Sequence, residues 1–361
     1  MKWPAAAAFA VATLLAAGAA RAHVVYGTDT LRGLVLQSDL VARVRTLDPG
    51  AQGSGASVPD APGLDAALGE PIVIAEVLEL IKGAPAPTPS PGPLRFVQHG
   101  HGVPIYAKDQ ETVIFLQKLE RTRELSALAG KVDWVSIQEG NALPGDPRLL
   151  AALRAYAALE KLPLAQQPQG LRQITVKLLA STDPMLASSA MRDVALLRDA
   201  PILTAEDLPA LEPIVWNSAT PMGVRVALLS ELERRKLVPG PPRWAKLLRE
   251  TRGTDQIAAV RALAAHPSAA VTHELVTLLA SPDPLLVSAA TISLGVPGNE
   301  KAVEPLGKLL ASSNERVRMA AIRGLGRIGT PAAQASLAQA AASHPDPATR
   351  RRAGAEVARQ P

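Results

Sequence analysis

Apolar and polar positions alternate along short runs in residues 23–145, and this two-residue period predicts β-strands. The run Asp39–Leu47 places alternate side chains on one face of a strand, namely Leu40, Ala42, Val44 and Thr46. Pro71–Ile81 is the strongest strand signal, although its spacing would also suit a helix over half of its length. A short helical turn is expected at Leu31–Gln37, and further strands are expected at Leu94–Gln98, Thr112–Leu119 and Val132–Gln138.

Segments rich in glycine and proline separate these runs. Residues 49–69 hold five Gly and three Pro, and residues 84–93 hold five Pro, which indicates extended loops. About five short strands within roughly 120 residues suit a small, partly open barrel of the OB type. Residues 23–145 are therefore predicted to form an OB-like β-domain.

Three of the runs also resemble a known family. The order SDLVARV (Ser38–Val44), EVLELIKG (Glu76–Gly83) and DQETVIFL (Asp109–Leu116) is similar to the netrin-like and TIMP-like OB modules. The resemblance covers about 90 residues and implies the OB fold. The chain contains no cysteine, so the disulfides and the inhibitory N-terminal cysteine of that family do not carry over.

From residue 146 onward the apolar spacing becomes helical, and a marker recurs where an apolar helix is expected to end. The marker ends at residues 181, 218, 250, 281, 312 and 343, so the last three steps are each 31 residues. Such a fixed period is typical of a repeat array in which each unit buries its apolar face on its neighbours. The register is clear from residue 241 onward and less regular before it.

Each marker is followed by a turn, often Asp-Pro, and then by a second helix. Aspartate can cap the free N–H groups of a helix start, and proline fits the first helical position. The segment Glu315–Gly329 resembles the second helix of a HEAT repeat, of the short kind found in phycobilin-lyase-type arrays. Residues 146–361 are therefore predicted to form a HEAT-like α-solenoid of six or seven helix pairs. The expected fold class is α+β multidomain, with the barrel first and the solenoid second.

The first 22 residues have the pattern of a signal peptide, with Lys2 before an apolar run at Ala5–Ala17. Cleavage is expected after Ala22, with a second possible site at Ala17–Ala19, and the alternative is an uncleaved anchor. With no cysteine for lipid attachment, the mature protein is expected to be soluble in the periplasm or secreted, in a bacterium. The predicted parts are thus 1–22, 23–145 and 146–361.

Charge is divided unevenly between the two predicted domains. Residues 23–145 carry 10 Lys and Arg against 14 Asp and Glu, whereas residues 146–361 carry 26 against 19. An arginine-rich end of the solenoid would bind an anion or an acidic protein, and we expect no nucleic acid because aromatic residues are not interleaved. The alternative is a solvated face and polar cap, with Arg318 in a ladder between repeats. The candidate residues are Arg316, Arg323, Arg327, Arg350, Arg351 and Arg352.

Histidine offers a second candidate site. If cleavage follows Ala22, His23 supplies an amine and an imidazole, and His99 and His101 in an H-G-H loop would complete a copper or zinc site. The alternative is an ordinary polar loop without metal. The remaining histidines in the repeats, His266, His273 and His344, are expected to be surface residues near turns.

Catalytic motifs are not found in the sequence. Ser, Asp and His residues are scattered without a recognisable pattern, and Glu76 and Glu79, three apart on one strand, are expected on opposite faces. We therefore expect an exported, non-enzymatic scaffold without cofactor, which is not embedded in the membrane and binds a protein of the cell envelope, an acidic one if the arginine-rich end is its binding site. The alternatives are the metal-binding protein and, third, a phycobilin-lyase-like enzyme.

Overall fold

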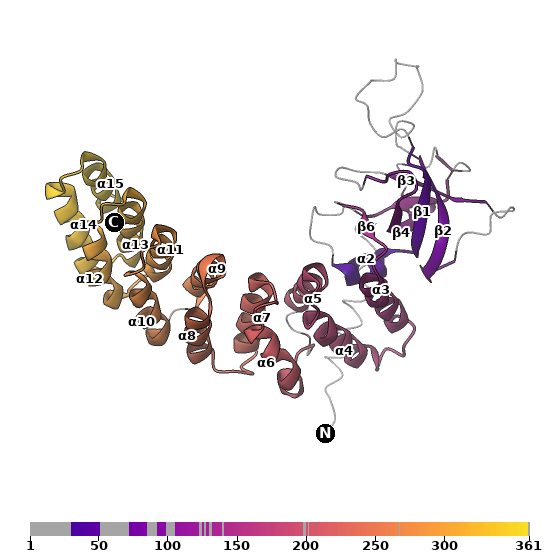
Figure 1. Ribbon diagram of the computed structural model, residues 1–361, viewed down its shortest axis with the longest axis horizontal. Coiled ribbons are helices and arrows are strands. Elements are labelled where there is room, and N and C mark those ends of the chain that lie inside the picture. The colour runs from indigo at the N-terminus through magenta and orange to yellow at the C-terminus, as the bar shows by residue number, and fades with distance from the viewer. Residues whose placement is uncertain are drawn as a thin grey trace, which may run out of the picture. The chain divides into compact units, whose positions relative to one another are not determined.

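A computed structural model describes the parts of the chain that carry the predicted elements. These are residues 30–50, 72–84, 92–98, 105–122, 125, 128–129, 132–138, 141–197, 200, 202–266 and 268–359. The chain forms two compact units, Met1–Asp207 and Leu208–Pro361 (Figure 1). The predicted leader 1–22 lies outside the described residues. Its boundary and the one at 145/146 stay predictions.

The first unit contains a closed β-barrel. Its strands are β1 (Leu40–Asp48), β2 (Ile72–Lys82), β3 (Leu94–Gln98), β4 (Glu111–Lys118), β5 (Trp134–Ser136) and β6 (Leu143–Pro144). The order is β1-β2-β3-β5-β4, and β4 pairs back with β1 to close the barrel. The β3–β5 pair is parallel and the other pairs are antiparallel. A five-stranded closed barrel with this order is the predicted OB-like fold, and β6 is a short addition to β4.

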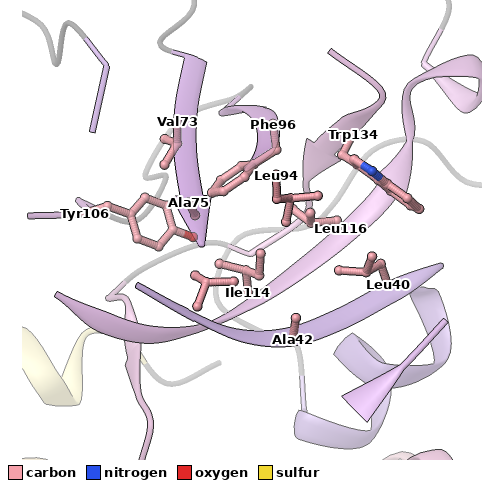
Figure 2. Close-up of a cluster of buried hydrophobic side chains, with 11 residues drawn as sticks. Leu40, Ala42, Val73, Ala75, Leu94, Phe96, Tyr106, Ile114, Leu116 and Trp134 are labelled. Carbon is pink, nitrogen blue, oxygen red and sulfur yellow. The ribbon is translucent and has the colours of Figure 1, made fainter. Parts of the chain in front are cut away.

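The barrel core contains the face of β1 that the two-residue alternation predicted. All four predicted side chains, Leu40, Ala42, Val44 and Thr46, are fully buried. Leu40, Ala42 and Val44 enter the apolar cluster of Figure 2, in which the rings of Phe96 and Tyr106 meet edge to face with centroids 5.6 Å apart. Burial raises the pKa of the Tyr106 hydroxyl. The cluster comprises Leu40, Ala42, Val44, Val73, Ala75, Leu94, Phe96, Tyr106, Ile114, Leu116 and Trp134.

One expectation for β2 was wrong. The pairing of β1 with β2 shifts register between Arg43 and Val44, so Arg43 lies opposite Glu79 and Arg45 lies opposite Glu76. Both carboxylates therefore reach the same arginine-bearing face, with Glu76 3.3 Å from Arg45 and Glu79 3.9 Å from Arg43. The irregularity cancels the alternation that would have put the two glutamates on opposite faces. The possible helical half of β2 is strand throughout.

Helices pack beside the barrel within the first unit. They are α2 (Leu31–Gln37), η3 (Leu119–Arg121), α3 (Pro147–Leu159), α4 (Gln167–Leu179), α5 (Pro184–Leu196) and η5 (Ala205–Asp207). Lys82 at the end of β2 donates to the Val35 carbonyl of α2 at 2.6 Å and to Glu160 beyond α3 at 2.8 Å. Arg154 of α3 pairs with Glu79 of β2. The change from strand to helix falls between β6 and α3, but α3 is tied to the barrel.

The second unit is the repeat array, in which successive helices form antiparallel pairs (Figure 1). The second helices α9, α11 and α13 begin at Gly253, Pro284 and Glu315, which reproduces the predicted 31-residue step. The helices are α6 (Leu208–Trp216), α7 (Met222–Arg234), α8 (Gly240–Glu250), α9 (Gly253–Ala262), η6 (Leu263–Ala265), α10 (Ala269–Leu278), α11 (Pro284–Leu294), α12 (Glu300–Leu309), α13 (Glu315–Ile328), α14 (Pro331–Ser343) and α15 (Pro347–Val357).

The turns that carry Asp-Pro cap the following helices, as the pattern predicted. Asp183, Asp283 and Asp346 cap α5, α11 and α15, and each accepts from one or two backbone N–H groups of the first turn, with proline at the helix start. Small residues let neighbouring second helices approach closely. A Cβ atom added to Gly295 would lie 2.9 Å from the Cα of Gly324, a contact that only glycine permits.

Candidate binding groove

A groove of about 420 Å³ lies across the second helices of three successive repeats, α9, α11 and α13. Its floor is apolar, since Ala289 and Ala320 are buried there, and Leu285 and Ile292 are 48% and 39% exposed. Three arginines stand around this floor. The lining residues are Arg261, Ala264, Leu285, Ser288, Ala289, Ile292, Ser293, Arg316, Ala320 and Arg323.

Two of the arginines that the sequence singled out line the groove, and a third lies beside it. Arg316, Arg323 and Arg327 are spaced by seven and four residues, which places them on one stripe of α13, and all three are exposed. Arg316 and Arg323 line the groove, and Arg327 extends to the Ile292 carbonyl at 3.4 Å. The geometry thus joins these side chains to the exposed apolar floor of α11.

Arg261 was missed by the sequence analysis, although the repeat register contains the signal that finds it. Arg261, Ile292 and Arg323 are each 31 residues apart, so they occupy the same position in successive repeats. Leu285 and Arg316 are a second pair in register. The groove is therefore lined by equivalent positions of the repeats, which alternate between a cationic and an apolar side chain.

The arginines of the groove have no anionic partner within the described part of the chain. None of its carboxylates comes within ion-pair distance of Arg261, Arg316, Arg323 or Arg327, whereas other arginines of the same unit are paired. Arg323 donates only to the Met319 carbonyl, at 3.3 Å. Exposed guanidinium groups beside an apolar floor are suited to bind carboxylates of a ligand that also carries an apolar side chain.

The remaining predicted arginines lie elsewhere. Arg350 closes the turn before α15 by donating to the carbonyls of His344 at 2.6 Å and Pro345 at 3.1 Å. Arg351 and Arg352 lie on α15 and do not line the groove. As candidate anion-binding residues they stay a prediction that the structure does not test.

Arg318 links neighbouring repeats, as the alternative interpretation of the arginine-rich end predicted. It donates to the Ser312 and Ser313 carbonyls and, in the next repeat, to Thr349 Oγ1 at 3.1 Å and Asp346 at 3.0 Å. Hydrogen bonds from Thr349 and Arg318 hold the pKa of Asp346 well below its usual range. Arg318 is thus committed to packing one repeat on the next.

The structure describes three of the six histidines of the chain. His23, His99 and His101 lie outside the described residues, and no group of metal-ligating side chains gathers among those that are described. His273 is exposed, as expected. His266 and His344 lie near turns, as expected, and both are partly exposed, but each also makes specific hydrogen bonds. His344 fills the turn between Leu310 and Asp346, where both ring nitrogens are bonded.

Part of the repeat array matches a known family. Residues 274–358 match the family model for HEAT repeats. No curated protein matches the chain in sequence. Among the helices that the structure describes, none is long and apolar enough to cross a membrane.

Several solved structures are similar to part of this chain at low sequence identity. Human deoxyhypusine hydroxylase in complex with glycerol is 22% identical, with 59% of this chain and 80% of that chain covered and a TM-score of 0.30. The Escherichia coli protein YibA is 14% identical, with 60% and 78% covered and a TM-score of 0.40. A computationally designed armadillo repeat protein for modular peptide recognition is 20% identical, with 52% and 98% covered and a TM-score of 0.33. The assignment of the repeats rests on the family match.

Proposed function

Because residues 274–358 of this chain are HEAT repeats, we propose that the second unit is a protein-binding module whose groove holds an acidic segment of a partner. Repeat solenoids use continuous surfaces formed by equivalent positions of successive units to bind extended ligands. The groove across α9, α11 and α13 has this character, since its lining residues recur with the 31-residue register.

The observation that carries the proposal is the set of unpaired arginines around exposed apolar side chains. Arg261, Arg316 and Arg323 are exposed and without an ion pair in the described part of the chain, beside Leu285 and Ile292. Exposed isoleucine and leucine side chains surrounded by arginines favour the binding of a peptide segment in which Asp or Glu flanks an apolar residue. Under this proposal the second unit acts as a scaffold, and its groove binds the partner without catalysing a reaction.

The location of that partner follows from the predicted leader. The pattern of residues 1–22 supports export and cleavage, and the absence of cysteine supports a protein without a lipid anchor. We infer that the partner is an acidic protein of the cell envelope, encountered in the periplasm or after secretion. The mass of the exported protein and the N-terminal sequence of the mature chain test this location directly.

Binding to an array of random 12-residue peptides tests the groove. We expect the bound peptides to be enriched in Asp and Glu around Leu or Ile, and to be released as salt rises from 50 to 300 mM. In the double variant Arg316→Glu, Arg323→Glu the affinity should fall at least tenfold. The matched control Lys301→Glu changes an exposed cation on α12, outside the groove, and should change affinity less than twofold.

Two results would contradict the proposal. The first is a set of bound peptides with no excess of acidic residues. The second is an equal loss of affinity in the groove variant and in Lys301→Glu, which would mean that net charge rather than the groove decides binding.

A further inference from the structure

A serine and a glutamate one turn apart on α7 meet a histidine from the turn after η6, next to α8. The ring of His266 lies between Ser230 and Glu233 of α7, with its Nε2 atom 3.0 Å from Ser230 Oγ. Its Nδ1 atom lies 3.0 Å from Glu233 Oε2. The imidazole therefore bridges the other two groups, with Nε2 at the serine hydroxyl and Nδ1 at the carboxylate.

The carboxylate fixes which nitrogen of His266 carries the proton. An ionised carboxylate can only accept hydrogen bonds, so the contact with Glu233 requires the proton on Nδ1. In the neutral imidazole, Nε2 then holds a lone pair and accepts the hydroxyl proton of Ser230. This is the arrangement in which an imidazole acts as general base toward a serine nucleophile, oriented by an acid.

Glu233 is itself held in place from a second direction. The indole Nε1–H of Trp244, a fully buried residue of α8, donates to Glu233 Oε2 at 2.7 Å. The carboxylate of Glu233 occupies the space that a Cβ atom on Gly240 would take, at the first residue of α8. Trp244 also stacks on the His266 ring, with centroids 4.5 Å apart.

We propose that Ser230 is an activated nucleophile that accepts an acyl group from reactive carboxylic esters. Ser230 Oγ forms a bond to the carbonyl carbon of the ester, and its proton passes to His266 Nε2. The bond from the carbonyl carbon to the leaving oxygen then breaks, and the proton on Nε2 is transferred to that oxygen. The products are an O-acyl serine and a free alcohol or phenol.

The position of Ser230 limits the chemistry to esters with good leaving groups. Ser230 lies inside α7, so its own N–H is bonded within the helix and is not free to stabilise an oxyanion. Aryl esters need less of this stabilisation because a phenolate leaves readily. The site is open to such reagents, since Ser230 is half-buried and the His266 side chain is 20% exposed. We therefore expect acylation with slow turnover.

The experiment is covalent labelling of the full chain by a fluorophosphonate, followed by peptide mass mapping. Wild type should be labelled at Ser230, with fluoride as the leaving group, and Ser230→Ala should lose the label. The matched control is Ser336→Ala, because Ser336 is a helical serine whose hydroxyl donates to the Ala332 carbonyl of its own helix. Its removal should leave the labelling rate unchanged.

Two variants of His266 test the role of the imidazole. One keeps most of the side-chain volume, and the other leaves room for added free imidazole. His266→Gln keeps much of the side chain and should label at least tenfold more slowly. His266→Gly should be equally slow and should regain labelling when free imidazole is added, which a purely structural histidine would not show. Glu233 is a positioning residue, so Glu233→Gln should slow the wild-type chain but have no further effect in His266→Gly rescued by imidazole. Circular dichroism confirms that each variant is folded.

Three results would overturn the proposal. These are labelling at sites other than Ser230, a labelling rate in folded His266→Gln equal to that of wild type, and no reaction of wild type at all. None of them bears on the groove, because Ser230, Glu233 and His266 do not line it.

Discussion

The hydroxyl of Thr30 donates a hydrogen bond of 2.6 Å to Asp193, which connects the cap of α2 to a fully buried carboxyl group in α5. The phenol of Tyr156 in α3 donates to the other oxygen of the same carboxyl at 3.1 Å. Burial raises the pKa of Asp193, and burial together with this carboxyl raises that of Tyr156. Three helices beside the barrel are thus joined through one acid whose charge is poorly solvated.

Asp193→Asn should change the pH dependence of stability. The raised pKa of Asp193 means that the folded chain keeps this proton to higher pH than the unfolded chain, so stability from the protonated form is lost as pH rises from about 4. Asparagine cannot ionise, so the free energy of unfolding of the variant should rise relative to that of wild type as pH increases. Urea unfolding between pH 4 and 7 measures this, and a difference that is constant with pH would contradict it.

Arg318→Ala should loosen the last repeat. The change removes donors from two carbonyls of the α12–α13 turn and from Thr349 and Asp346, at a cost of about 2 kcal/mol. Hydrogen exchange in α14 and α15 should become faster. Arg316→Ala, two residues earlier on the same helix, removes an exposed side chain without an ion pair and should cost less than ~0.5 kcal/mol. Equal effects of the two changes would argue against the ladder.

Gly324→Ala should separate α11 from α13. The added Cβ would lie 3.0 Å from the Thr291 carbonyl oxygen and 2.9 Å from a Leu306 methyl group, so both neighbours must shift by a few tenths of an ångström, and we expect a loss of ~1–3 kcal/mol. Gly223→Ala is the control, because its Cβ would meet nothing within 4 Å, and alanine should stabilise α7 by ~0.5 kcal/mol. Thermal unfolding measures the stability of both variants. An unchanged melting temperature in Gly324→Ala would contradict close packing of α11 on α13.

Lys82→Met should weaken the attachment of α2 and α3 to the barrel. The Lys82 ammonium is mostly buried between the Val35 carbonyl and Glu160, and both would lose their donor, at a cost of about 1–2 kcal/mol. On the same barrel, Lys118 pairs with Glu120 at 3.7 Å with both side chains more than half exposed. Lys118→Met should therefore change the free energy of unfolding by less than ~0.5 kcal/mol, and a larger effect there would point to a general loss of charge.

Much of the fold could be predicted because it depends on local periodicity. The buried face of β1 follows from alternation alone, and the start of each late second helix follows from the 31-residue step. The Asp-Pro caps were equally predictable, since a cap depends on residues two or three positions away. The candidate groove was found in part, through Arg316 and Arg323, and the same register would have supplied Arg261.

The two architectures and their order along the chain could be predicted from local patterns, because strand alternation and helical spacing are properties of neighbouring residues. Tertiary structure decided how β1 closes the barrel by pairing with both β2 and β4, and how a shift in register brings Glu76 and Glu79 to one face. It also decided that His266 meets Ser230, 36 residues earlier. No period marks that meeting, because it depends on how one repeat packs against the next rather than on the pattern within either.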